Sequence, residues 1–339
     1  MARFSRMAVL NEVVDGGLVP LYYNPDIEIV IKAISAAAAG GAKVFEFTNR
    51  GDNAYQLFPD LVKFFEKEEP SLILGVGSVV DPGTASLYLS SGANFIVGSV
   101  TNPEVARLCN RRKVPYMPGC GTASEISNAE ELGVEIVKIF PGMAVGGPSF
   151  VKSVLAPTPW TRIMPTGGVK ATKENINEWF AAGVSAVGMG SGLFKKDWIS
   201  EDNFEAITDL TVKIFNWIKA ARGQSVFMGV EHVGLYPTDK AGAEEIGQWY
   251  RDVFGLALKE GNSAFFVSGE GSGRIEIVKK TSPVGCHVCI EVSDFEAAVE
   301  HLAVKGIELE EPKIRPATKA VFLKQADPAG NTVHILWRK

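Results

Sequence analysis

The segment EIVKIFPG, residues 135–142, places a lysine in the middle of an apolar run. Four apolar residues flank Lys138, and a Pro-Gly pair ends the run, which is the pattern of a buried strand. Burying an unpaired ammonium is costly, so this lysine must reach solvent, find a partner or lose its proton. A neutral amine held among apolar side chains can attack a ketone and form a Schiff base.

The segment KVFEFTNR, residues 43–50, supplies the other groups that such chemistry needs. Glu46, Thr48 and Arg50 alternate along one face of a strand, over about 13 Å at roughly 3.3 Å per residue. Glu46 could move protons, and Arg50 could bind the carboxylate of a 2-keto acid with a hydroxyl from Thr48 or Ser78. The alternative is that the lysine and Glu46 form a structural ion pair.

Two later strand ends are rich in glycine. PTGG at 165–168 and GMGSG at 188–192 could expose backbone N–H groups to a phosphate or another anion. Glycine also occurs at such turns for backbone geometry alone, which is the alternative. Thr122 in PGCGTASE ends another strand, and we count it among the candidate substrate contacts.

The elements that carry these groups repeat from residue 17 to 222. Short apolar runs such as GLVPLYY, LILGVGS and RIMPTGG alternate with helical segments such as DIEIVIKAISAAAAGG. Eight strand–helix units predict an α/β fold, the (β/α)8 TIM barrel. A doubly wound open sheet is less favoured, because no G-x-G-x-x-G follows the first strand.

Composition fits a soluble globular protein of 339 residues with 46% hydrophobic and 22% charged residues. The net charge of −5 without a basic stripe argues against nucleic-acid binding, and no apolar run approaches a membrane span. The start shows no secretory signal, and four cysteines suggest a reducing compartment, so we expect a cytoplasmic protein. We expect domains at 1–222 and 229–339, joined by a linker at 223–228.

The tail is an internal duplication. Beyond residue 228 the chain reads β-α-β-β-β twice, with IELEE (307–311) as the second strand of the second copy. His232 and His287 occupy equivalent places 55 residues apart, and Glu276 and His334 do so 58 apart. A lone C-x-x-C at 286–289 would point its cysteines to opposite faces of a strand, so we expect no zinc knuckle there.

The motifs GGAKVFEFTNRG, GVGSV, PGCGTASE, VKIFPG and PTGGV, in this order, resemble the 2-keto-3-deoxy-6-phosphogluconate / 4-hydroxy-2-oxoglutarate aldolase family. The resemblance covers about residues 10–222 and implies a class I aldolase, a homotrimer that needs no metal. It implies cleavage of a 2-keto-3-deoxy sugar acid to pyruvate and an aldehyde.

The same resemblance assigns roles to the residues. It implies Lys138 as the Schiff-base lysine and Glu46 as the general acid/base. Residues around the pyruvate moiety would be Arg50, Thr48 and Ser78, and those facing the distal phosphate would be Thr166, Gly167, Gly168, Gly190 and Ser191. Three departures, Ser78 in place of the usual Thr, VGSVTNP after the fourth strand and FPGMAVGG after the sixth, leave the sugar acid and its phosphate open.

The tail, about residues 227–339, resembles the vicinal oxygen chelate superfamily, which includes glyoxalase I. The resemblance implies metal ligands at His232, Glu276 and His287, with His334 where a second Glu is usual. Such a donor set suits Zn²⁺, Fe²⁺, Ni²⁺ or Mn²⁺. The alternative is a module that only binds small molecules or packs subunits.

Two other functions compete with an aldolase. One is a binding protein whose barrel senses a keto acid, and the other is a phosphate-sugar epimerase or isomerase on the same barrel. A pyruvate-release assay would separate the binding protein from the leading prediction. An epimerase or isomerase needs no Schiff base, so imine trapping would separate that rival.

Overall fold

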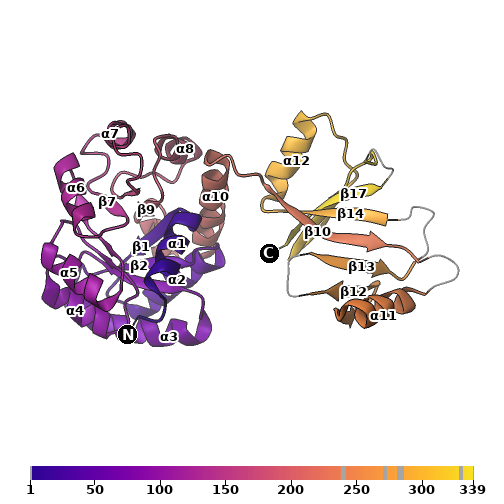
Figure 1. Cartoon of the computed structure of the whole chain (residues 1–339), viewed down its shortest axis with the longest axis horizontal. Coiled ribbons are helices and arrows are strands. Elements are labelled where there is room, and N and C mark those ends of the chain that lie inside the picture. The colour runs from indigo at the N-terminus through magenta and orange to yellow at the C-terminus, as the bar shows by residue number, and fades with distance from the viewer. Residues whose placement is uncertain (1, 238–241, 270–272, 281–285, 328–330, 339) are drawn as a thin grey trace. The chain divides into compact units, whose positions relative to one another are not determined.

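The computed structural model describes residues 2–237, 242–269, 273–280, 286–327 and 331–338. The chain divides into two compact units, Met1–Gly223 and Gln224–Lys339, which are called the first and second unit below (Figure 1). None of the helices in the described residues is long and apolar enough to cross a membrane.

The first unit alternates strands and helices, and its helices surround the strands (Figure 1). In chain order its elements are α1 (Arg6–Gly16), β1 (Leu18–Tyr22), α2 (Ile27–Ala39), β2 (Val44–Thr48), α3 (Ala54–Glu68), β3 (Ile73–Gly77), α4 (Pro82–Ser90), β4 (Ile96–Val97), α5 (Pro103–Arg112), β5 (Tyr116–Met117), β6 (Gly119–Cys120), α6 (Ala123–Glu131), β7 (Val137–Ile139), α7 (Gly147–Leu155), β8 (Ile163–Pro165), α8 (Lys173–Ala181), β9 (Val187–Met189), α9 (Lys196–Ser200) and α10 (Glu205–Ala221).

All strand pairs of the first unit are parallel, which confirms the predicted α/β class. One sheet has the order β5-β4-β3-β2-β1-β9, and the other has the order β6-β7-β8. A parallel bridge between Thr166 and Gly188 joins the end of β8 to β9. Only Pro118, which has no N–H to donate, separates β5 from β6.

Two apolar layers hold the first unit together. Outward-facing strand residues pack against the helices; the rings of Phe47 on β2 and Phe58 on α3, for example, are 5.9 Å apart. A second cluster joins inward-facing residues near the starts of the strands, Val44, Ile73 and Ile136 among them, with α1. Because strand side chains alternate, positions two residues further along share this inward face, and these are Glu46, Gly75 and Lys138.

The described residues of the second unit form one eight-stranded sheet with two helices on it (Figure 1). Its elements are β10 (Phe227–Leu235), α11 (Ala243–Phe254), β11 (Ala257–Glu260), β12 (Ala264–Ser268), β13 (Arg274–Val278), β14 (Cys286–Val292), α12 (Phe295–Val304), β15 (Lys313–Arg315), β16 (Thr318–Phe322) and β17 (Thr332–Arg338). The strand order β11-β12-β13-β10-β14-β17-β16-β15 places the two β-α-β-β-β modules symmetrically about the antiparallel pair β10–β14.

The two faces of this sheet differ. Ile277 of β13 packs in the apolar cluster that includes α11, and Ile335 of β17 packs in the one that includes α12. Alternation therefore directs Glu276 and His334, their immediate neighbours, to the opposite face. One face is thus the core, and the other carries the polar groups that the duplication predicts.

Candidate active site and candidate metal centre

Lys138 and Glu46 lie together inside the first unit. The lysine Nζ is 3.8 Å from Glu46 Oε1, and their side chains are only 6% and 1% exposed. The ring of Phe140 lies 5.3 Å from the ammonium and adds a cation–π contact. Glu46 Oε2 has no hydrogen-bond partner among the described residues. A buried structural ion pair needs further hydrogen bonds to offset desolvation, so this half-satisfied carboxylate is better suited to moving protons.

Burial dominates the ionisation of Glu46. Desolvation raises the pKa of this carboxyl, and the positive charges of Lys138 and Arg50 oppose the shift without cancelling it. A carboxyl with a raised pKa can both accept and donate a proton near neutral pH, which is what a general acid/base must do.

Gly77 on β3 makes room for this carboxylate. A Cβ placed there would lie 1.6 Å from Glu46 Oε1, so no residue with a side chain fits without displacing Glu46. Glu46 pairs with Gly75 on β3, and Gly77 lies two residues further along on the same face of that strand. The prediction from the sequence named Ser78 in GVGS and missed the role of the glycine before it.

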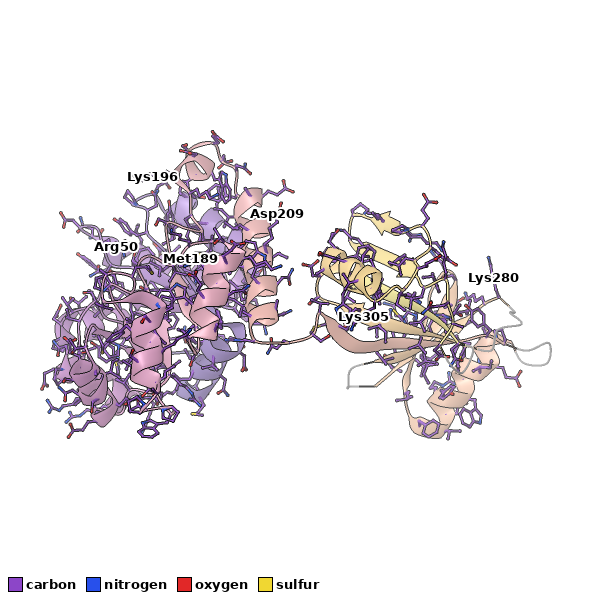
Figure 2. All side chains as sticks on the ribbon, turned by 90° about the horizontal axis from the view of Figure 1, so that it is seen from above. Arg50, Met189, Lys196, Asp209, Lys280 and Lys305 are labelled. Atoms are coloured by element: carbon purple, nitrogen blue, oxygen red, sulfur yellow. The ribbon has the colours of Figure 1, made fainter. Side chains whose placement is uncertain are left out.

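The candidate pyruvate-binding residues Thr48, Ser78 and Arg50 differ in how deeply they are buried. Thr48 is buried on the same face of β2 as Glu46. Ser78 follows β3, is half-buried and has a φ of 62°, a left-handed conformation that is uncommon for serine and that clusters at functional sites. Arg50 lies exposed beyond the end of β2 (Figure 2).

The glycine-rich ends of β8 and β9 are adjacent. The Thr166–Gly188 bridge links them, and a Cβ on Gly188 would lie 2.2 Å from Thr166 Oγ1. That hydroxyl is buried and has no hydrogen-bond partner in the described part of the chain. Gly167 and Gly168 have φ of 89° and 84°, and Gly190 and Ser191 follow β9. Within the described residues, the N–H groups of positions 168, 191 and 192 donate to no backbone acceptor.

Thr122 is exposed and caps α6. Its hydroxyl accepts from the Glu125 N–H at 3.2 Å and donates to Glu125 Oε2 at 3.0 Å. The same carboxylate accepts from the N–H of Gly121, the residue before the N-cap, at 2.8 Å, an arrangement close to a capping box. The sequence pattern T-x-x-E already contained this signal, so the structure gives Thr122 a capping role that the prediction did not consider.

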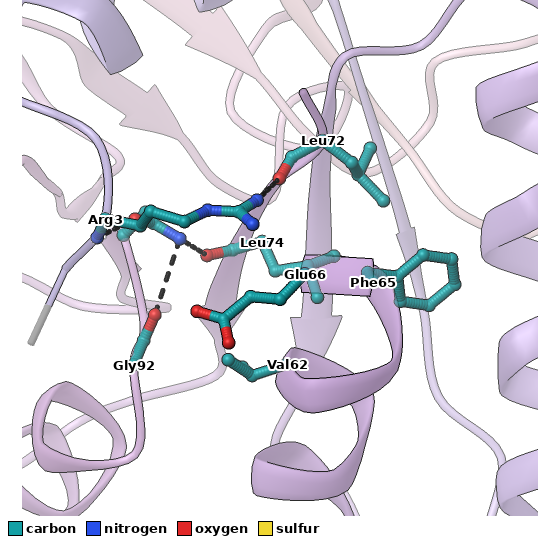
Figure 3. Close-up of a pocket in the computed structure, with 8 residues that line it drawn as sticks. Arg3, Val62, Phe65, Glu66, Leu72, Leu74 and Gly92 are labelled. Atoms are coloured by element: carbon teal, nitrogen blue, oxygen red, sulfur yellow. Dashed lines mark hydrogen bonds between the residues drawn. The ribbon is translucent and has the colours of Figure 1, made fainter. Parts of the chain in front are cut away.

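A small pocket lies at the opposite ends of the strands, where β3 begins (Figure 3). Arg3 Nη2 donates to the Leu72 carbonyl at 2.9 Å, and Asn94 Nδ2 donates to the Leu74 carbonyl at 3.0 Å. The first bond joins the start of the chain to the residue before β3, and the second joins the segment before β4 to β3. The pocket carries none of the candidate reacting groups, which come from the carboxyl ends of the strands.

In the second unit the four predicted ligands meet on the helix-free face. His232 Nε2 lies 2.8 Å from Glu276 Oε2 and 3.0 Å from His287 Nε2, and that second imidazole is 3.6 Å from the same carboxylate oxygen. The His334 ring centroid is 5.3 Å and 5.2 Å from those of the other two imidazoles. All three histidines are buried.

Neighbouring groups orient two of these imidazoles. His232 Nδ1 contacts Glu231, and His287 Nδ1 lies 3.2 Å from the Tyr236 hydroxyl. Their other nitrogens, both Nε2, therefore point at each other and at Glu276. Metal-ligating histidines are usually held in this way by a carboxylate or hydroxyl on the outer nitrogen. The prediction missed both outer groups, and only Glu231, adjacent to His232, could have been suspected from sequence.

Gly234 has the same function here that Gly77 has in the first unit. It pairs with Glu276 on one side and with His287 on the other. A Cβ at Gly234 would lie 1.8 Å from the His287 ring. The close approach of imidazole and carboxylate thus depends on a glycine between them.

Electrostatics in this cluster are strongly coupled. Burial disfavours charge on His232, but hydrogen bonds to a thiol and two carboxylates raise its pKa to about 11. Hydrogen bonds from His232 and His287 hold the pKa of Glu276 well below its usual range. Burial and the charge of its neighbours lower the pKa of His334 to about 4, so that imidazole stays neutral and can donate a lone pair.

The residues fit a divalent ion. The ligand atoms of His232, Glu276 and His287 all lie within 4.8 Å of one another, as do those of His232, Cys289 and His334. His334 Nδ1 is buried without a partner in the described residues. Imidazole nitrogens and a carboxylate converging in this way are typical ligands of zinc, iron and nickel.

The first unit thus places a buried lysine–glutamate pair, from β7 and β2, inside a set of parallel strands with glycine-rich ends, an arrangement that suits a carbon–carbon lyase. A family model described as KDPG and KHG aldolase matches residues 9–210, more than half of the chain. The chain therefore belongs to the KDPG and KHG aldolase family. This confirms the resemblance drawn from the five motifs and the prediction of a carbon–carbon lyase.

Individual relatives agree. The chain is 27% identical over 216 residues to the 2-dehydro-3-deoxy-phosphogluconate aldolase of Haemophilus influenzae, covering 64% of this chain and 99% of that protein. It is 28% identical over 196 residues to the KHG/KDPG aldolase of Escherichia coli K12, covering 58% and 89%. A solved KDPG aldolase from Legionella pneumophila, with pyruvate captured as a covalent carbinolamine intermediate, superposes with a TM-score of 0.55 at 26% identity, covering 60% and 97%.

A glyoxalase-like domain is present in the second unit. A model described as Glyoxalase/Bleomycin resistance protein/Dioxygenase superfamily matches residues 230–335. This range includes all four predicted ligands and confirms the second resemblance.

Proposed function

We propose that the first unit cleaves a 2-keto-3-deoxy sugar acid to pyruvate and an aldehyde through a Schiff base on Lys138. The observation that carries this proposal is the buried pair of Lys138 Nζ and Glu46 Oε1, 3.8 Å apart, with the second carboxylate oxygen unpartnered. A nucleophile and a proton carrier must be this close to act on one substrate.

The reaction follows from these two groups. The Lys138 ammonium first gives its proton to Glu46, and the neutral amine adds to the C2 ketone. Glu46 then returns a proton to the hydroxyl that leaves as water, which gives a protonated imine. Glu46 accepts the proton of the C4 hydroxyl, the C3–C4 bond breaks, and its electron pair moves to the imine nitrogen as an enamine. Protonation at C3 and hydrolysis then release pyruvate and the free lysine.

Arg50, Thr48 and Ser78 bind the pyruvate moiety in this proposal. Arg50 supplies a charged fork for the substrate carboxylate, and its exposed position after β2 lets that carboxylate enter from solvent. Thr48 lies buried next to Glu46, where a hydroxyl could hold the ketone oxygen or the departing water. Thr122 stays a weaker candidate, since its hydroxyl already caps α6.

Imine trapping tests the mechanism. Incubation of the full chain with pyruvate and borohydride should add one lactyl-sized mass to a single lysine. A rival epimerase or isomerase on the same fold would remain unmodified under these conditions. The absence of any adduct would therefore reject the Schiff base and favour the rival.

We also propose that a distal phosphate or another anion binds between Thr166–Gly168 and Gly190–Ser191. The free N–H groups at these strand ends and the unpartnered Thr166 hydroxyl support this site. Comparing kcat/KM for phosphorylated and unphosphorylated 2-keto-3-deoxy acids is the test. Equal values would mean that the site does not select phosphate.

The strands β1–β9 would support this site as a closed (β/α)8 barrel. We propose that β5 and β6 are two halves of one strand interrupted at Pro118, and that the Thr166–Gly188 bridge closes the ring. A homotrimer and a cytoplasmic location stay predictions from the resemblance and the cysteine content. Light scattering on the purified full chain tests the oligomer.

For the second unit we propose one divalent ion per chain, held by His232, Glu276, His287 and His334. The converging nitrogens and the orienting contacts from Glu231 and Tyr236 support it. Such an ion, when bound, polarises an oxygen of a small ligand. Elemental analysis of protein purified without a metal-affinity column is the test, and less than about a tenth of an equivalent with no uptake on titration would reject it.

A further inference from the structure

Cys289 lies at the centre of the polar face of the second unit. It is on β14, two residues after His287, and therefore shares that residue's face. The register places Cys289 directly opposite His232 on β10 and directly opposite His334 on β17. The side chain is fully buried. One thiol thus lies between two imidazoles in a row across three adjacent strands.

The spacing of this row suits one metal ion. The ligand atoms of His232, Cys289 and His334 all lie within 4.8 Å of one another. Donors that bind one zinc ion at about 2.0–2.3 Å are at most roughly 4.6 Å apart, so only a small closing movement is needed. An apolar core would gain nothing from bringing a thiol and two imidazoles together.

His334 supplies an independent sign that a ligand belongs here. Its Nδ1 is buried and has no hydrogen-bond partner in the described ranges, although the residue is only 6% exposed. The Phe322 ring covers one side, with centroids 4.4 Å apart, and offers no acceptor. Buried imidazole nitrogens in folded proteins nearly always have a partner, so we expect that a bound ligand satisfies His334 Nδ1.

We propose that Cys289 is a thiolate ligand of the divalent ion, on the side of the site formed by His232 and His334. This inference rests on the metal centre proposed above and adds to it a fifth donor that no pattern in the sequence indicated. As the metal bonds form, the thiol of Cys289 and the protonated imidazole of His232 each release a proton to solvent. The Glu276 carboxylate and the Cys289 thiolate then carry two negative charges, which balance a divalent ion among neutral imidazoles.

A thiolate changes which ion the site prefers. Thiolate and imidazole favour borderline and soft ions such as Zn²⁺, Co²⁺ and Ni²⁺, whereas carboxylate-rich sites favour Mn²⁺ and Mg²⁺. The site should therefore bind Zn²⁺ and Co²⁺ in clear preference to Mn²⁺. Removing the sulfur should reduce that preference, because Mn²⁺ gains little from a thiolate.

Cobalt substitution tests the proposal without any enzymatic activity. The untagged full chain is stripped of metal and titrated with Co²⁺ without oxygen, and the near-ultraviolet charge-transfer band of a cobalt–thiolate bond is recorded. We expect the band in the wild type and its loss in Cys289→Ser, with Co²⁺ still bound. We also expect Cys289→Ser to weaken Zn²⁺ binding by about 100-fold or more, above the roughly 10–100-fold typical of outer partners, and Mn²⁺ binding far less.

Cys286→Ser is the matched control. Cys286 lies on the same strand but faces the other way, and its Sγ contacts Asn331 Oδ1 at 2.7 Å. This variant should keep the band and the Zn²⁺ affinity of the wild type. Retained pyruvate release and an unchanged circular dichroism spectrum would show that each variant is folded.

The outcomes separate this inference from the metal centre itself. Stoichiometric Co²⁺ without a charge-transfer band, or a band that survives in Cys289→Ser, would overturn the thiolate ligand and leave the four-residue site standing. Failure to bind Co²⁺, Zn²⁺ or Mn²⁺ at all would overturn both. In that case the contact between Cys289 and His232 is only a hydrogen bond on the polar face.

Discussion

The first and second units both place ionisable groups on buried strands, but they do so at different points along the strand. In the first unit Glu46 and Lys138 follow an apolar inner layer and lie near the carboxyl ends of parallel strands. In the second unit His232, His287 and His334 lie within strands of a mixed sheet, on the face opposite the apolar core.

The number of charged groups follows from these positions. In the first unit the Lys138–Glu46 pair lies next to an apolar layer. Burial is therefore the largest influence on Glu46, and it raises the pKa of that carboxyl. The polar face of the second unit gathers three imidazoles, a carboxylate and a thiol, so that coupling between neighbours dominates. Sparse, desolvated groups suit covalent and proton-transfer chemistry, whereas dense donors suit an ion.

Removing the amine of Lys138 should have the largest effect and should impair the first unit alone. Lys138→Ala should abolish imine trapping and lower pyruvate release by roughly 10⁴–10⁶-fold, the order found when a covalent nucleophile is lost. Lys43→Ala, at an exposed lysine paired with Glu12 at 3.4 Å, is the control and should behave as wild type. Normal turnover in Lys138→Ala would show that the first unit does not work through this strand.

Removing the proton carrier should have the next largest effect. Glu46→Gln keeps the shape of the side chain but loses the titratable group, so turnover should fall by about 10²–10⁴-fold while borohydride still traps an imine. Glu125→Gln is the control, because that carboxylate caps α6 and should leave turnover almost unchanged. If the imine and turnover fell equally in Glu46→Gln, Glu46 would be required to form the imine.

The two glycines allow a crossed experiment. A Cβ at Gly77 would collide with Glu46 and one at Gly234 with His287, at 1.6 Å and 1.8 Å. Gly77→Ala should therefore lower turnover by up to about 10²-fold, because small misplacements of reacting groups are that costly. Gly234→Ala should weaken metal binding by roughly 10–100-fold and leave turnover alone.

Each variant in this pair is the control for the other. Isothermal titration with Zn²⁺ and a pyruvate-release assay are run on both. A loss of turnover in Gly234→Ala, or a loss of metal affinity in Gly77→Ala, would mean that the two sites depend on each other.

Much of the arrangement could be predicted from the sequence because alternation is a strict rule for strands. Glu46, Thr48 and the apolar run around Lys138 indicated the inward face, and the 55- and 58-residue spacings indicated equivalent positions for the candidate ligands. The same rule placed Cys286 and Cys289 on opposite faces, which is correct, yet it also put Cys289 on the face of His287. That consequence was missed because C-x-x-C was considered only as a pair.

Other features depend on contacts between distant strands, which no local pattern reveals. The roles of Gly77 and Gly234 follow from register across neighbouring strands. The prediction of a strand at IELEE, residues 307–311, was wrong. Its acidic residues stay exposed, and only Leu309 forms a bridge, to Leu323, whereas β15 begins after Pro312 at Lys313–Arg315.

The smallest expected effect on catalysis is the one that separates the two units most clearly. Chelation should leave pyruvate release within roughly twofold of the untreated protein, because a Schiff base supplies the electron sink that a metal would otherwise supply.

The stability of the second unit should respond to chelation instead. When the free ion is present at 100 times its Kd, binding adds about 2.7 kcal/mol to the free energy of unfolding. Its removal should therefore lower the melting temperature of that unit by on the order of 10 °C. Calorimetry of the full chain before and after chelation, with Zn²⁺ added back to restore the transition, measures this. A large loss of turnover on chelation, reversed by Zn²⁺, would mean that the ion serves the aldol reaction and that the two sites form one catalytic system.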